Sequence, residues 1–302
     1  TPSKMRISLR DLNLIKSATK IWEEISDLNN VQVEFHKLNG VVPVLLIRDL
    51  YKYPDKVHEF LKTLDYWETK DYDTNSIVRP GLTHVFSEPL FPWFAKGTTS
   101  IFEKIFGVSQ LKVMDIYVQA TSGHMTLDTT GGLCCYPHMD CDVFDNIVEA
   151  EYPDPVFVAN INLTKSVDPV TTGFWSYRNK HSFLDFTRED KNSITDFYDR
   201  HEDQTIDQWF QMRDYEDFKF ETSADMMYNS MVVYSTGYLH NPYIMPEWFK
   251  DDHRLMMSIF YHLSPQHLDF EERDVDNICA AWEHFRLDTL YNYHPRQTEP
   301  QF

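Results

Sequence analysis

The chain has 302 residues, of which 42% are hydrophobic and 15% aromatic, enough for a sizeable packed core and too many for global disorder. Its formal net charge of −19 disfavours binding to nucleic acid or to an anionic membrane surface. No signal peptide opens the sequence and no run reaches the ~20 apolar residues of a membrane span, so we expect a cytoplasmic protein.

The four cysteines contain no CxxC pair, which favours a reducing compartment over a disulfide framework. They are Cys134, Cys135, Cys141 and Cys279. Adjacent side chains on a strand point to opposite sides, so joint metal ligation by the first two is awkward. We expect buried thiols.

Residues 1–110 are predicted to form helices and strands that buttress a core. Asn39-Gly40 separates two strand-like runs, 31–35 and 41–47, and predicts a hairpin turn. Helical apolar spacing, or a proline in the first turn, favours three helices. These helices are predicted over residues 15–25, 54–64 and 94–106.

Between residues 111 and 264 the apolar pattern changes to the period of a strand. Strands are predicted over residues 113–120, 133–138, 156–163, 172–177, 226–234 and 255–263. Residues 182–220 are polar and charged, and we interpret them as an insertion with a helix within 185–213. Residues 265–302 are expected to form a C-terminal helix (278–290) and a tail.

The tripeptide His138-Met139-Asp140 carries the strongest chemical signal. Residues two apart on a strand project from the same side, so an imidazole and a carboxylate lie together as two ligands for one metal. His240 is the preferred third ligand. Two histidines and one carboxylate on one face of an octahedral ion leave the opposite face open, as in non-heme Fe(II) sites.

Other residues compete for these roles. His253 and His262 are rivals of His240, but neither is followed by an arginine at a comparable distance, whereas Arg254 lies downstream of His240. Asp142 shares the strand face of Asp140, and we expect it outside the ligand set or in solvent.

Strands that flank a metal tripeptide, with helices mostly before them, predict a mainly β fold with flanking helices (α+β). Its core would be a double-stranded β-helix, a jelly-roll form related to the cupins. The absence of an internal repeat and of a clean linker favours a single domain over residues 1–302.

The order His138, Asp140, His240 and Arg254 resembles that of the Fe(II)/2-oxoglutarate-dependent dioxygenases, over residues 111–264. The resemblance implies that the first three residues hold iron and that Arg254 binds the distal carboxylate of 2-oxoglutarate. It further implies hydroxylation of a C–H bond, with O2 consumed and succinate and CO2 released as co-products.

The strand pattern gives Arg254 an independent argument. Arg254, Met256 and Ser258 share one face of a strand that is largely apolar on both faces. A guanidinium buried there needs an anion, either a bound carboxylate or an internal acidic side chain. The family usually places a hydroxyl two residues after the arginine; here that position is Met256, and the hydroxyl comes at Ser258.

Further ligand contacts are expected along neighbouring strands. Tyr117 and Ser258 are candidates for binding the cosubstrate. Gln119, Asn160 and Trp175 are candidates for binding the substrate. For Asn160 and Trp175, hydrogen bonding within the fold and core packing are the alternatives.

The sequence leaves the substrate open within one class, a small molecule or the side chain of an amino acid or peptide. Two other functions stay open as well, a jelly-roll protein with a structural metal or none, and a cupin-like metalloenzyme that does not use 2-oxoglutarate. Arg254 separates these hypotheses, because only the oxygenase requires a basic residue there.

Overall fold

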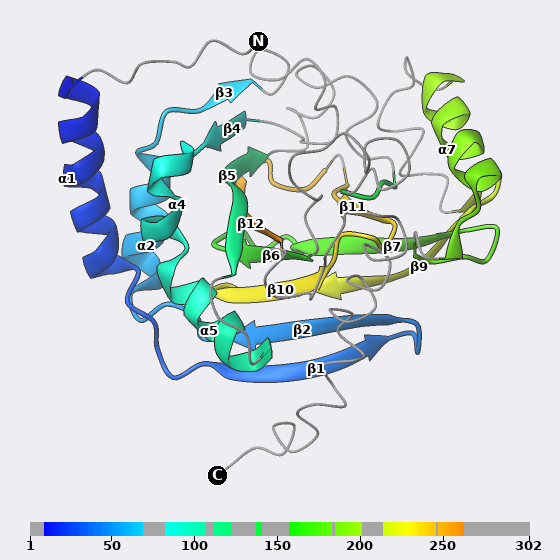
Figure 1. Cartoon of the computed structure of the whole chain (residues 1–302), viewed down its shortest axis with the longest axis horizontal. Coiled ribbons are helices and arrows are strands. Elements are labelled where there is room, and N and C mark those ends of the chain that lie inside the picture. The colour runs from blue at the N-terminus through cyan, green and yellow to red at the C-terminus, as the bar shows by residue number, and fades with distance from the viewer. Residues whose placement is uncertain are drawn as a thin grey trace, which may run out of the picture.

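The computed structural model describes residues 9–68, 82–106, 111–121, 137–140, 157–182, 185–200, 214–245 and 247–262. Two antiparallel sheets form its centre (Figure 1). The larger has eight strands in the order β1-β2-β10-β6-β12-β5-β4-β3, and the smaller has four in the order β11-β7-β9-β8.

The strands of the larger sheet are β1 (Gln32–Leu38), β2 (Val42–Arg48), β3 (Trp67–Glu68), β4 (Leu82–Val85), β5 (Lys112–Thr121), β6 (Phe157–Asn162), β10 (Ser230–Ser235) and β12 (Arg254–His262). Those of the smaller sheet are β7 (Thr171–Tyr177), β8 (Asp214–Tyr215), β9 (Phe218–Asp225) and β11 (His240–Tyr243). The helices are α1 (Leu9–Ile25), α2 (Pro54–Lys62), η1 (Glu88–Leu90), α4 (Phe91–Phe94), α5 (Lys96–Phe106) and α7 (Arg188–Arg200).

The alternation of the strands between two sheets defines the architecture. Along the chain, β5, β6, β10 and β12 join the larger sheet, while β7, β9 and β11 join the smaller one. An isolated antiparallel bridge between His138 and His240 adds the segment 137–140 beside β11. This is the double-stranded β-helix, and the predicted fold class is confirmed.

The N-terminal third does more than buttress this core. The hairpin of β1 and β2 forms at the predicted turn, where Asn39 and Gly40 both have positive φ, and β2 pairs with β10. β3 and β4 extend the opposite edge through β5. Four of the eight strands of the larger sheet therefore come from this region.

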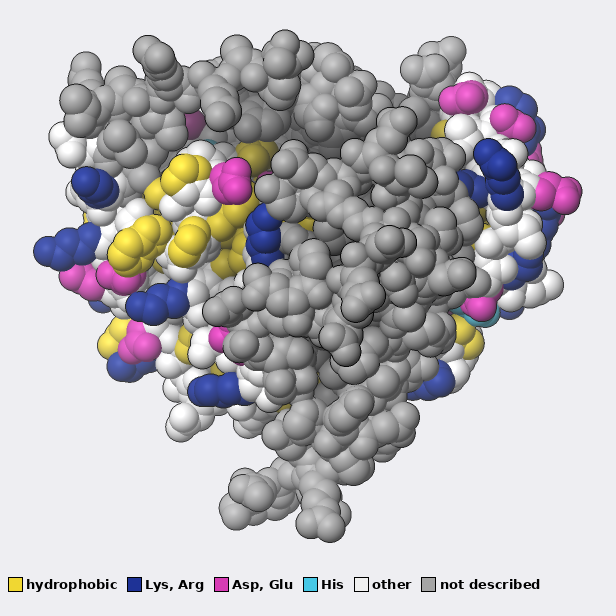
Figure 2. Space-filling view, viewed as in Figure 1, with side chains coloured by type: hydrophobic (Ala, Val, Ile, Leu, Met, Phe, Trp, Pro, Cys, Tyr) yellow, Lys and Arg dark blue, Asp and Glu magenta, His cyan; other side chains and the backbone are white. Residues whose placement is uncertain are grey.

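The helices α1, α2, α4 and α5 lie together on one side of the molecule (Figure 1). Trp22 of α1 is 1% exposed, and its ring contacts Phe60 of α2 and Phe94 of α4, with ring centroids 5.5 Å and 5.0 Å away. Large aromatic rings therefore join the three helices. On the outside, apolar side chains remain visible among lysines and acids (Figure 2).

The predicted insertion 182–220 is only partly correct. Its helix is present as α7, but residues from 214 onward belong to the smaller sheet as β8 and β9. In β9, Phe218 and Phe220 alternate with Lys219 and Glu221, and Phe218 is 1% exposed. The charged residues at these alternate positions hid the two-residue period of a strand, although of the two only Lys219 is exposed and Glu221 accepts a hydrogen bond from the buried Ser176.

The predicted strand 226–234 begins later than expected. Residues 226–229 precede β10, and Asn229 adopts a positive φ of 61°. Its side-chain amide accepts a hydrogen bond from the Tyr51 N–H and donates one to the Tyr51 carbonyl, both 2.9 Å. A polar side chain that bonds the backbone in this way favours a turn over a continued strand.

Several predictions lie outside the described residues. They concern Cys134, Cys135, Cys141, Cys279, Asp142, most of the strand 133–138 and the C-terminal region 265–302. In the described part of the chain, no helix has the length and hydropathy needed to cross a bilayer.

Candidate metal centre and ligand cavity

The backbone brings the two histidines together. The His138 N–H donates to the His240 carbonyl at 2.8 Å, and the His240 N–H donates to the His138 carbonyl at 2.9 Å. The Asp140 N–H donates to the Thr236 carbonyl at 3.1 Å. Because these bonds tie residues far apart in the chain, the three side chains take fixed positions on one sheet edge.

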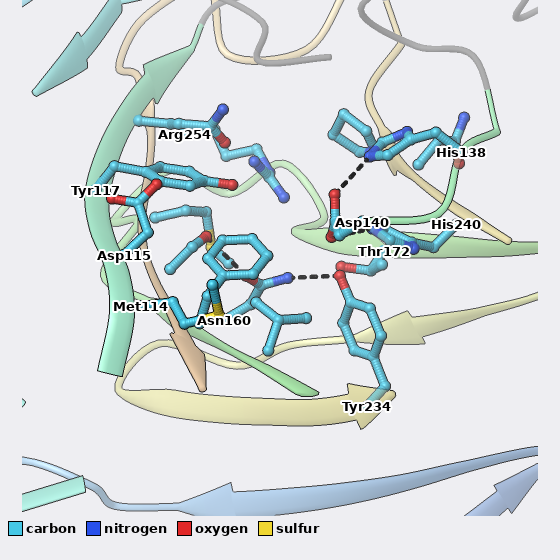
Figure 3. Close-up of a pocket in the computed structure, with 17 residues that line it drawn as sticks. Met114, Asp115, Tyr117, His138, Asp140, Asn160, Thr172, Tyr234, His240 and Arg254 are labelled. Atoms are coloured by element: carbon cyan, nitrogen blue, oxygen red, sulfur yellow. Dashed lines mark hydrogen bonds and ion pairs between the residues drawn. The ribbon is translucent and has the colours of Figure 1, made fainter. Parts of the chain in front are cut away.

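The side-chain atoms of His138, Asp140 and His240 converge on one point (Figure 3). The Asp140 carboxylate lies 3.0 Å from His240 Nε2 and 3.5 Å from His138 Nε2. All three candidate ligand atoms lie within 4.8 Å of one another. This is the spacing expected of groups around a single ion.

A hydrogen bond sets the tautomer of His240. Its Nδ1–H donates to the Tyr238 carbonyl at 2.8 Å, so Nε2, which lies 3.0 Å from the Asp140 carboxylate, is the ring nitrogen left for a metal. Metal-binding imidazoles commonly hold their second nitrogen in this way.

The charge state of Asp140 also suits a ligand. Burial opposes its ionisation, but the adjacent His240 charge and hydrogen bonds from both imidazoles hold the pKa of Asp140 well below its ordinary value. Asp140 is therefore a carboxylate at neutral pH. Two imidazole nitrogens and one carboxylate oxygen fit a first-row divalent ion and leave coordination positions for further ligands.

A cavity of about 460 Å³ opens next to this cluster. It is lined from both sheets, so it occupies the interior of the β-helix. Its lining residues are Met114, Asp115, Tyr117, Gln119, His138, Asp140, Val158, Asn160, Thr172, Tyr234, His240, Asn241, Pro242, Arg254, Met256, Ser258 and Phe260.

Arg254 lies across the cavity from the three candidate ligands (Figure 3). It is 3% exposed, and Met256, Ser258 and Phe260 line the cavity from the same face of β12. The face assignment made from the strand period is therefore confirmed. The buried guanidinium and the three candidate metal ligands therefore lie on opposite walls of one cavity.

Besides Arg254, the sequence predicted five residues that bind the cosubstrate or the substrate. Four of them line this cavity: Tyr117, Gln119, Asn160 and Ser258. They come from three adjacent strands, and the register places Ser258 of β12 opposite Tyr117 on one side and Asn160 on the other.

Trp175 is not among the lining residues. Its Nε1–H donates to Asn241 Oδ1 at 2.9 Å, and its ring meets Phe220 edge-on. A Cβ on the neighbouring Gly173 would lie 2.5 Å from the same Asn241 oxygen. Trp175 therefore holds Asn241, the residue after His240, from behind the cavity wall.

Sequence reasoning missed Tyr234, Thr172 and Asn241. Tyr234 lies at the end of a predicted strand, but the period of two does not reveal which face of that strand turns inward. Of the rival histidines, His253 is exposed and lies outside the cavity, and the side chain of His262 lies outside the described residues.

No family model and no curated protein matches the chain. Some solved structures are similar to it. HygX from Streptomyces hygroscopicus with nickel, 2-oxoglutarate and hygromycin B bound has a TM-score of 0.45 and 12% identity, over 73% of this chain and 83% of that chain. HygX with iron bound has a TM-score of 0.43 and 12% identity, over 74% and 83%.

The non-heme alpha ketoglutarate dependent epimerase SnoN from nogalamycin biosynthesis has a TM-score of 0.40 and 10% identity, over 83% of this chain and 84% of that chain. Because the identities are 10–12% and the TM-scores lie below 0.5, these similarities assign neither a ligand nor a reaction to this chain.

Proposed function

We propose that the chain is an Fe(II)- and 2-oxoglutarate-dependent oxygenase. The observation that carries the proposal is the pairing of two features in one cavity, a cluster of two histidines and a carboxylate and, opposite it, the buried guanidinium of Arg254. A metal site alone would not require that cation, whereas a dicarboxylate cosubstrate would bind the metal at one end and the guanidinium at the other.

In this proposal His138, Asp140 and His240 hold the iron. The metal with its cosubstrate supplies the oxidising chemistry, in which O2 is consumed, 2-oxoglutarate is converted to succinate and CO2, and a substrate C–H bond is hydroxylated. Three protein ligands leave coordination positions for the keto acid and for O2.

Arg254 binds the distal carboxylate of 2-oxoglutarate in this scheme. Its planar guanidinium can donate two parallel hydrogen bonds, and its burial limits screening by water. The Tyr117 hydroxyl, on the adjacent strand β5, is an additional donor, whereas Ser258, on β12 itself, gives its O–H to Asn160 Oδ1.

The apolar part of the wall serves a second purpose. Met114, Val158, Met256 and Phe260 line the cavity and restrict water near the reacting groups. Gln119 and Asn160 are the proposed polar contacts for the substrate, a small molecule or an amino-acid or peptide side chain. The acidic net charge makes nucleic acid a poor candidate.

Anaerobic titration with Fe(II) and 2-oxoglutarate tests the proposal. The expected result is a weak visible charge-transfer band that needs both components, because the band arises only when the keto acid chelates the metal. Binding of Fe(II) without any response to 2-oxoglutarate would overturn the proposal in favour of a metalloenzyme of another type or a structural metal site. Absence of Fe(II) binding would reject every metal-dependent function considered for this chain.

A further inference from the structure

A chain of three hydrogen-bonded side chains crosses one wall of the cavity. Ser258 Oγ donates to Asn160 Oδ1 at 2.7 Å, and Asn160 Nδ2 donates to the Tyr234 hydroxyl oxygen at 2.9 Å. The three residues belong to the adjacent strands β12, β6 and β10. Each is at most 9% exposed.

These two hydrogen bonds leave one proton without an assigned acceptor, that of the Tyr234 hydroxyl. Because the Tyr234 oxygen accepts from Asn160, its own O–H is directed elsewhere. In the part of the chain that the structure describes, no residue accepts a hydrogen bond from it. Tyr234 is 2% exposed, and an unsatisfied buried donor is costly, so a ligand in the cavity is its natural acceptor.

Tyr234 keeps that proton at neutral pH. The ordinary pKa of a phenol, about 10, already lies well above neutral pH. The phenol is therefore a hydrogen-bond donor rather than a phenolate.

The position of Tyr234 indicates which part of a ligand it would reach. Its ring meets the His240 imidazole edge-on, with centroids 5.0 Å apart. Figure 3 shows the hydroxyl at the end of the cavity that holds Asp140 and His240, with the Asn160 amide on the side toward Arg254. A molecule anchored at Arg254 and bound to the metal must pass over this pair.

We propose that the Tyr234 hydroxyl donates a hydrogen bond to the keto oxygen of the metal-bound cosubstrate, and that Ser258 and Asn160 set its direction. The inference rests on the proposed function. The keto oxygen is chosen because it is the first metal-binding atom of 2-oxoglutarate reached from the distal carboxylate.

The position of the charge-transfer band reports this hydrogen bond directly. The transition moves electron density from the metal to the keto carbonyl, and a donor on that oxygen lowers its energy. Tyr234→Phe removes only the hydroxyl, so its band should move to higher energy. The affinity for 2-oxoglutarate should fall roughly 2- to 10-fold, the range for one neutral hydrogen bond. Fe(II) binding should persist.

Tyr261→Phe is the matched control. Tyr261 is fully buried on the opposite face of β12, and its hydroxyl contacts Thr98 and Thr99 away from the cavity. This variant loses a buried phenol hydroxyl but should keep the wild-type band.

A double-mutant cycle tests the role of Asn160. Asn160→Asp replaces the amide donor with an acceptor of the same shape, which should turn the Tyr234 proton away from the cavity. In that background Tyr234→Phe should cause no further band shift. An equal shift in both backgrounds would overturn the role of Asn160.

The outcomes separate the two proposals. If the wild type shows no band, the proposed function fails and this inference fails with it. If the wild type shows the band and Tyr234→Phe leaves it unmoved, only the inference is overturned, whatever happens to the affinity. A shift in Tyr234→Phe that is absent from Tyr261→Phe supports the inference.

Discussion

Replacement of Arg254 by alanine addresses the residue on which the proposed function depends. The guanidinium is 3% exposed, so its contact with a bound carboxylate is weakly screened by solvent. Two parallel charge-assisted hydrogen bonds are lost, with a net cost of about 2–4 kcal/mol. The dissociation constant for 2-oxoglutarate should therefore rise roughly 30- to 700-fold.

The measurement is the anaerobic titration of each Fe(II)-loaded variant with 2-oxoglutarate, followed through the charge-transfer band. Arg254→Lys keeps the charge but loses the two-pronged geometry, so an intermediate loss of about tenfold is expected. Retention of Fe(II) by both variants would show that the substitutions weaken binding of 2-oxoglutarate and not binding of the metal.

Arg48→Ala is the control for removal of a positive charge. Arg48 pairs with Glu34 at 2.7 Å between β2 and β1, on strands that contribute nothing to the cavity lining. Its affinity for 2-oxoglutarate should equal that of the wild type. A dissociation constant within about threefold of wild type for Arg254→Ala would refute the assignment of Arg254 to the distal carboxylate.

Three further predictions concern the metal, the cavity wall and acid stability. Replacement of any one candidate ligand by alanine should abolish Fe(II) retention on dialysis and leave the circular dichroism spectrum unchanged. The candidate ligands are His138, Asp140 and His240. Gly173→Ala should lower the free energy of unfolding by about 1–3 kcal/mol, since its Cβ would lie 2.5 Å from Asn241 Oδ1; an unchanged melting temperature would contradict this. Burial raises the pKa of Asp190, but hydrogen bonds from Lys180 and Thr187 hold it at about 2, below its value in the unfolded chain. The stabilisation, on the order of 1–2 kcal/mol, should therefore be present above pH about 4 and lost as the pH falls toward 2, and Asp190→Asn should remove that pH dependence from urea titrations.

The sequence determined the features that depend on local spacing. Residues two apart on a strand share a face, and this rule alone pairs His138 with Asp140 and groups Arg254 with Met256 and Ser258. The Asn39-Gly40 turn formed as expected because both residues tolerate positive φ.

The tertiary structure decided what local spacing leaves open. The pairing of His138 with His240 is a bridge between distant segments, and it is this contact that selects His240 from thirteen histidines. Likewise, the strand period groups side chains by face without saying which face turns inward. The structure placed Tyr234 in the cavity and Trp175 behind its wall because each strand's orientation depends on the sheet that it joins, and that is fixed by contacts between residues far apart in the chain.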